Sequence, residues 1–154
     1  QEEYFSEFLE LLPLVTKKTG LKIVIPVHLS PNVKDTIHSK FASEKNIVLL
    51  PPVDYPNLIA LMDASQAIIS DSGGIQEEAP SLGKHVFITR TSTERPEVIE
   101  SGYGELLDLK NPEESAERVR VFIQEETKEN KNPNPFGDGT TSAQIVRIIS
   151  EKFG

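Results

Sequence analysis

The residues best suited to chemistry follow a short apolar run at 67–69, which predicts the end of a buried strand. They are Ser72, Gly73 and Gly74, and a helical pattern over 75–82 begins directly after them. Unpaired N–H groups and the dipole at a helix start favour an anion, and glycine lets a phosphate approach the backbone closely. The Ser72 hydroxyl adds a donor. The sequence therefore predicts a phosphate site. The alternative is a glycine turn that only connects strand to helix, since neither G-x-G-x-x-G nor a P-loop pattern is present.

Glu78 extends this predicted site by one helical turn. It lies four residues after Gly74, so both residues share one helix face. If a diphosphate occupied the glycine turn, the Glu78 carboxylate would lie where it could accept hydrogen bonds from ribose hydroxyls. Its neighbour Glu77 points about 100° around the helix, so we expect that side chain to face solvent or a helix cap. Alternatively, both carboxylates only favour the first helical turns through the dipole.

Two further residues follow other predicted strands. His28 comes directly after the strand at 22–27, and Arg95 lies in a hydroxyl-rich loop after the strand at 85–89. In open α/β sheets the carboxyl ends of the strands are where ligands bind. For His28 the alternative is a histidine in a surface loop. For Arg95 the alternatives are a surface charge, the commoner position of arginine, or a pair with a phosphate or with a carboxylate at the helix cap.

The apolar pattern along the chain alternates between strands and helices. Strands that alternate with helices form a parallel sheet, since each crossover helix returns the chain to the same edge. This order predicts an α/β fold with a doubly wound parallel sheet, covered by helices on both faces. The 154 residues fit a single domain over 1–154 with a full core. We predict strands at 22–27, 46–50, 66–69, 85–89 and 104–107, and helices at 2–19, 32–41, 55–62, 75–82, 96–101, 112–126 and 140–153.

Composition and charge argue against several classes of function. The net charge of −8 argues against nucleic acid and anionic membranes as partners, and no window is apolar enough for a membrane span. The chain has no cysteine, which excludes disulfides and thiolate metal sites, and we expect no metal, no cofactor and a cytoplasmic location. The Gln-Glu-Glu start lacks the basic segment of a signal peptide, so none is expected. The helical pattern begins at once, as though the chain were cut from a longer one.

Five segments taken together resemble the non-hydrolysing UDP-N-acetylglucosamine 2-epimerases. Their order and spacing agree with the family along nearly the whole chain. The longest segment, 71–84, is far more specific than a lone glycine motif. The resemblance implies a Rossmann-like domain, the C-terminal half of a two-domain enzyme of the GT-B type. The N-terminal domain, which carries the main acid/base carboxylates of the family, is missing from this sequence. The segments are PVHLSPN at 26–32, DY at 54–55, DSGGIQEEAPSLGK at 71–84, TERPE at 93–97 and NPFGDG at 134–139.

The resemblance also implies a chemistry, the interconversion of UDP-GlcNAc and UDP-ManNAc by elimination and re-addition of UDP. Residues 72–74 would hold the phosphates, Glu78 would bind the ribose hydroxyls, and Arg95 would place positive charge near the diphosphate. His28 would be a catalytic, proton-handling or polar group near the leaving phosphate. The ligand would be UDP or a UDP-N-acetylhexosamine. The full-length enzyme would be a homodimer that serves cell-envelope polysaccharide synthesis. This half of the enzyme alone would be inactive.

One position departs from the family pattern. Leu58, on the helix predicted at 55–62, stands where family members often carry an aromatic residue close to the uracil. Leucine packs on a base but loses the stacking interaction. Two other functions remain open at this point. One is the nucleotide-sugar-binding domain of a GT-B glycosyltransferase, and the other is a UDP-sugar sensor without catalysis.

Overall fold

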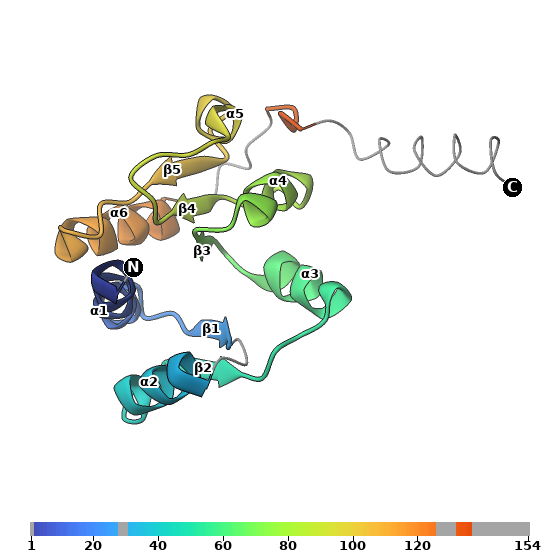
Figure 1. Cartoon of the computed structure of the whole chain (residues 1–154). Helices are drawn as coiled ribbons and strands as arrows, with labels where there is room; N and C mark the ends of the chain where they lie inside the picture. Colours follow the sequence, from blue (N-terminus) through green and yellow to red (C-terminus); the bar gives the residue numbers. More distant parts are fainter. Residues whose placement is uncertain (1, 28–30, 126–131, 137–154) are drawn as a thin grey trace, which may run out of the picture. The chain divides into compact units, whose positions relative to one another are not determined.

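The computed structural model describes residues 2–27, 31–125 and 132–136 (Figure 1). It divides into two compact units, Gln1–Ala64 with Leu107–Lys128 and Ser65–Leu106 with Glu129–Gly154. The single domain expected over 1–154 stays a prediction. The helix predicted at 140–153 lies outside the described residues.

In the first unit two long helices pack against each other. They are α1 (Glu2–Thr19) and α6 (Pro112–Gln124). Apolar side chains recur at helical spacing on each, so one face of each helix can be buried. Beside this core the Lys18 ammonium lies 3.3 Å from a carboxylate oxygen of Glu113 and 3.7 Å from one of Glu117. The buried apolar side chains of the two helices are Leu9, Leu11, Leu12, Val15, Ala116 and Val119.

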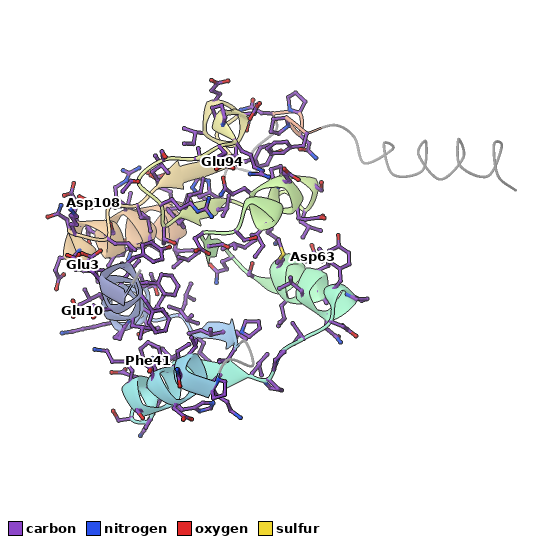
Figure 2. The ribbon with its side chains drawn as sticks, viewed as in Figure 1. Glu3, Glu10, Phe41, Asp63, Glu94 and Asp108 are labelled. Carbon is purple, nitrogen blue, oxygen red and sulfur yellow. The ribbon has the colours of Figure 1, made fainter. Side chains whose placement is uncertain are left out.

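The first unit also holds a two-stranded parallel sheet. β1 (Ile23–Pro26) pairs with β2 (Ile47–Leu50), and the first residues of the two strands lie opposite each other. α2 (Pro31–Phe41) lies between them in the chain and is the crossover that a parallel pair needs. Its side chains Ile37 and Phe41 are buried, and Figure 2 labels Phe41 at the end of this helix.

α3 (Tyr55–Ala64) follows β2 and completes the first unit. The carboxylate of Asp54 caps this helix, since its Oδ1 accepts a hydrogen bond from the Asn57 N–H at 3.0 Å. Met62 is buried, and Leu58 is half-buried one helical turn earlier.

The second unit has a three-stranded parallel sheet with the order β3-β4-β5. Its strands are β3 (Ile68–Ser70), β4 (Val86–Ile88) and β5 (Gly104–Leu106). The central strand β4 is fully buried along its length. Two helices belong to this sheet, α4 (Gly73–Ser81) on β3 and β4 and α5 (Pro96–Glu100) on β5, and they also contact each other (Figure 1).

Residues 132–136 are attached to the second unit by side-chain hydrogen bonds. The Asn132 amide donates to the Ser101 carbonyl oxygen at 2.8 Å, and the Tyr103 hydroxyl donates to the Asn132 carbonyl oxygen at 2.8 Å. The Asn134 amide donates to Ser81 Oγ at 3.0 Å, at the end of α4. This part of the NPFGDG segment therefore packs on the unit that contains the glycine-rich helix start.

The predicted α/β fold is confirmed. Every helix and strand predicted before residue 126 is present, with its ends within two residues of the prediction, and all paired strands are parallel. Hydrogen bonds join β1 to β2 in the first unit, and β3 to β4 to β5 in the second. Within the described ranges, no helix combines the length and the apolar character needed to cross a bilayer.

Candidate anion-binding site

The start of α4 has the geometry of an anion site. Ser72 is its N-cap residue with an extended backbone (φ −76°, ψ 127°), and its Oγ accepts a hydrogen bond from the Ile75 N–H at 3.5 Å. The helix begins at Gly73, two residues before the predicted start, so Gly73 and Gly74 open its first turn. Among the described residues the N–H groups of these glycines have no acceptor, as is usual at a helix start. These two donors and the positive end of the helix dipole favour an anion in front of the helix.

The hydroxyl of Ser72 was predicted as a donor to the anion. In the structure it accepts the capping hydrogen bond from Ile75, and its backbone N–H donates to Ser70 Oγ at 3.0 Å. A hydroxyl that accepts can still donate its own proton. The cap and the predicted role of Ser72 are therefore compatible, and the cap fixes the position of the oxygen.

Sheet topology brings Arg95 to the same helix start. β3 and β4 are parallel neighbours, so their carboxyl ends meet at one edge of the sheet. The first strand leads into α4, and the loop after the second carries Arg95. A Cβ atom placed on Gly73 would lie 2.5 Å from Nη1 of Arg95 and 2.7 Å from its Cζ. The guanidinium group therefore lies across Gly73, and the structure brings residues 72–74 and Arg95 together, while their role toward a phosphate stays a prediction.

Glu77 is the ion-pair partner of Arg95. Nε of Arg95 donates to Oε1 of Glu77 at 2.5 Å, and this hydrogen bond raises the pKa of Arg95 above its ordinary value. The guanidinium group therefore stays charged. A second carboxylate, that of Glu94, is 83% exposed and lies 3.8 Å from Nη1, and Figure 2 labels it beside α5. Glu77 was expected to face solvent or a helix cap; its side chain is 48% exposed, and its ion-pair partner Arg95 is the N-cap residue of α5.

A buried hydrogen-bonded pair fixes the loop to the helix. Gln76 is 1% exposed, and its Oε1 accepts a hydrogen bond from the Thr93 hydroxyl at 2.6 Å. The same Thr93 oxygen accepts from the backbone N–H of Arg95 at 3.0 Å. Sequence reasoning missed both residues, although helical spacing places Gln76 on the face of the buried Ala79 and Pro80. A buried amide needs a partner, and the hydroxyl-rich loop after β4 offers several hydroxyl groups.

The other predicted site residues are Glu78, Leu58 and His28. Glu78 is half-buried on α4, directly after Glu77. Leu58 is half-buried on α3 in the first unit, and His28 lies outside the described residues. In the part of the chain that the structure describes, no three His, Cys, Asp or Glu side chains are grouped as a metal ion would require.

The chain is similar to known proteins along almost its whole length. Residues 1–150 match the family model of UDP-N-acetylglucosamine 2-epimerase. A UDP-N-acetylglucosamine 2-epimerase of Salmonella borreze is 40% identical over 140 residues, which make up 89% of this chain and 37% of that protein.

Solved structures agree with this similarity. The UDP-GlcNAc 2-epimerase from Neisseria meningitidis bound to UDP-GlcNAc matches with a TM-score of 0.77 and 37% identity, over 95% of this chain and 41% of the other. The S. aureus MnaA–UDP co-structure matches with a TM-score of 0.82 and 30% identity, over 97% of this chain and 42% of the other. The chain thus spans about two fifths of the length of these proteins.

Proposed function

The chain belongs to the UDP-N-acetylglucosamine 2-epimerase family, and we propose that it is the UDP-binding, C-terminal half of such an enzyme. The complete enzyme would interconvert UDP-GlcNAc and UDP-ManNAc. We propose a homodimer in the cytoplasm that supplies precursors of cell-envelope polysaccharide, with the acid/base carboxylates on the N-terminal domain. The 154-residue chain alone would bind UDP or a UDP-N-acetylhexosamine without turning it over.

One observation carries the proposal, the guanidinium group of Arg95 lying across the glycine-rich start of α4. Two backbone donors, a hydroxyl and the Nη donors of a guanidinium group there can bind the oxygens of a diphosphate. Neither a structural glycine turn nor a surface arginine requires this arrangement. Relatives whose structures contain UDP or UDP-GlcNAc share the fold at 37% and 30% identity, which supports the same ligand class.

The arrangement suits the step in which UDP leaves. A base removes the C2 proton of the sugar, the C2–H electron pair forms the C1–C2 double bond, and the C1–O bond breaks with its electrons going to UDP. Negative charge therefore grows on the diphosphate, where residues 72–74 and Arg95 would stabilise it. Re-addition reverses these bond changes after a proton reaches the other face of C2. His28 would handle a proton near the leaving phosphate.

The ribose would bind to Glu78. With the diphosphate at Gly73 and Gly74, the nucleoside extends along α4, and Glu78 lies one turn further on the face of Gly74. An ionised carboxylate is an acceptor with two oxygens, so it can accept both ribose hydroxyls at once. Since Glu77 is bonded to Arg95, the two neighbouring carboxylates would have separate roles.

Titration calorimetry with UDP and 2′-deoxy-UDP tests this proposal. A hydrogen bond to a charged group contributes roughly 1.5–3 kcal/mol, so we expect 2′-deoxy-UDP to bind about tenfold more weakly to the unsubstituted chain. Glu78→Gln should reduce this preference, and Glu77→Gln should leave it intact. Equal binding of the two nucleotides by the unsubstituted chain would refute the ribose role. A chain that binds no UDP at all would refute the proposed function.

A further inference from the structure

Arg95 reaches the proposed diphosphate site from a loop, and that loop is fixed to α4 at two points. Resting on the proposed function, we infer that Thr93 and Glu77 are positioning residues for the diphosphate. Neither would contact the ligand. Thr93 would hold the backbone of Arg95, and Glu77 would hold its guanidinium group over Gly73.

The first point of attachment acts on the backbone. Thr93 donates to the buried amide oxygen of Gln76 at 2.6 Å and accepts from the Arg95 N–H at 3.0 Å. A continuous line of hydrogen bonds thus runs from the buried face of α4 to the peptide group of the arginine. Hydrogen bonds shielded from water are stronger than exposed ones, so these hydrogen bonds fix the position of the loop after β4 along the axis of α4. It also fixes the residue at which α5 begins, since Arg95 is the N-cap of that helix.

The second point of attachment acts on the side chain. A guanidinium group has five N–H donors in a rigid planar fork, and Glu77 accepts from the one at Nε. The atoms nearest to Gly73 are Nη1, Cζ and Nη2. The distance of 3.8 Å between Nη1 and Glu94 is too long for a hydrogen bond. Glu77 therefore holds the inner edge of the fork, and the Nη donors remain over the helix start, where a diphosphate would bind.

A negative charge beside a diphosphate site also has an opposing effect, because it repels the ligand. Two substitutions of Glu77 separate positioning from repulsion. Glu77→Ala removes both the acceptor and the charge, whereas Glu77→Gln removes the charge and keeps an amide oxygen that can accept from Nε. If Glu77 positions Arg95, glutamine should preserve UDP binding much better than alanine. If Glu77 only repels the ligand, both substitutions should strengthen binding.

The experiment is a double-substitution cycle in the 154-residue chain, with UDP binding measured by calorimetry and uridine binding by NMR titration. We expect Glu77→Ala to weaken UDP binding about three- to tenfold, with uridine binding unchanged because uridine carries no phosphate. In an Arg95→Ala background the same change should not weaken UDP binding, since only the repulsion by Glu77 is then removed. Glu94→Gln is the matched control, since it removes an equal charge from a neighbouring position without removing a hydrogen bond.

Thr93→Val provides a second, independent variant. It removes the hydroxyl that joins Gln76 to the Arg95 backbone, so UDP binding should fall while uridine binding stays constant. Unchanged or tighter UDP binding by Glu77→Ala would overturn the positioning role of Glu77. A loss of equal size in the Arg95→Ala background would do the same. Absence of UDP binding by the unsubstituted chain is a different outcome, which overturns the proposed function and this inference with it.

Discussion

Alanine in place of Gly73 would bring a Cβ atom to 2.5 Å from Nη1 of Arg95, whereas ordinary contacts of a Cβ begin at 3.4 Å. Nη1 must therefore retreat by about 0.9 Å. The neighbouring Gly74 differs, because a Cβ there meets nothing nearer than Ser72 Oγ at 3.7 Å. Both glycines belong to the first turn of α4, and neither has a positive φ. A comparison of Gly73→Ala with Gly74→Ala thus isolates the effect of contact with the guanidinium group.

Helix propensity alone favours alanine over glycine by about 0.5–1 kcal/mol in a helix. Gly74→Ala should therefore raise the free energy of unfolding by up to about that amount. Gly73→Ala gains the same propensity, but the alanine displaces the guanidinium group from its hydrogen bond with Glu77. We expect a smaller gain, or a net loss, at position 73. In an Arg95→Ala background nothing remains to be displaced, so the two glycine substitutions should become equivalent.

Urea unfolding of the four single and double variants measures these differences, and the NMR signal of the Arg95 Nε–H reports the guanidinium group directly. That signal should shift in Gly73→Ala and stay in place in Gly74→Ala. Equal stabilisation by both alanines in the presence of Arg95, with an unchanged Nε–H signal, would show that the guanidinium group does not lie across Gly73. Arg95 would then contribute no positive charge to the proposed diphosphate site.

Three other predictions concern the first unit and the whole chain. Leu58→Phe should tighten UDP binding about two- to tenfold if the side chain packs on uracil, since stacking adds about 0.5–1.5 kcal/mol; calorimetry showing no change would contradict that role. The hydrogen bond from Arg120 lowers the pKa of Glu117 below its ordinary value, so its contribution to stability is present above about pH 4.5 and is lost as the pH falls through the lower folded value. Urea unfolding between pH 3 and 6 should then show a weaker acid dependence in Glu117→Gln. Finally, without the rest of the enzyme no base meets C2, so NMR in deuterated buffer should detect no C2 exchange of UDP-GlcNAc, and measurable exchange would contradict the proposed division of the active site.

The elements of the fold were readable from the sequence because each one is marked locally. Short apolar runs such as 46–50, ended by Pro51, predict buried strands, and amphipathic runs such as 75–82, ended by Gly83, predict crossover helices. The order of the strands within each unit was not predicted. Periodicity shows that a strand is buried, but the partner of a strand depends on contacts distant in sequence.

The candidate site was predictable as far as topology determines it. Once two strands are parallel neighbours, the segments after them meet at one edge, which is sufficient to bring Arg95 near the glycines. The partner of Arg95 was not predictable in this way. It depends on the path of the loop at 90–95, and that path is fixed by one hydrogen bond between Thr93 and a buried glutamine. No periodic pattern in the sequence marks such a hydrogen bond.

The first two turns of α4 combine three properties that depend on one helical register. Gly73 and Gly74 supply N–H donors, Glu77 binds the inner edge of the Arg95 guanidinium group, and Glu78 continues along the face of Gly74. One residue inserted between Gly74 and Glu77 would rotate both carboxylates by about 100° relative to the helix start. Arg95 would then lose its partner, and Glu78 would leave the face on which we place the ribose. The adjacent glutamates are therefore not interchangeable, since their side chains leave the same helical turn in different directions and have different proposed partners.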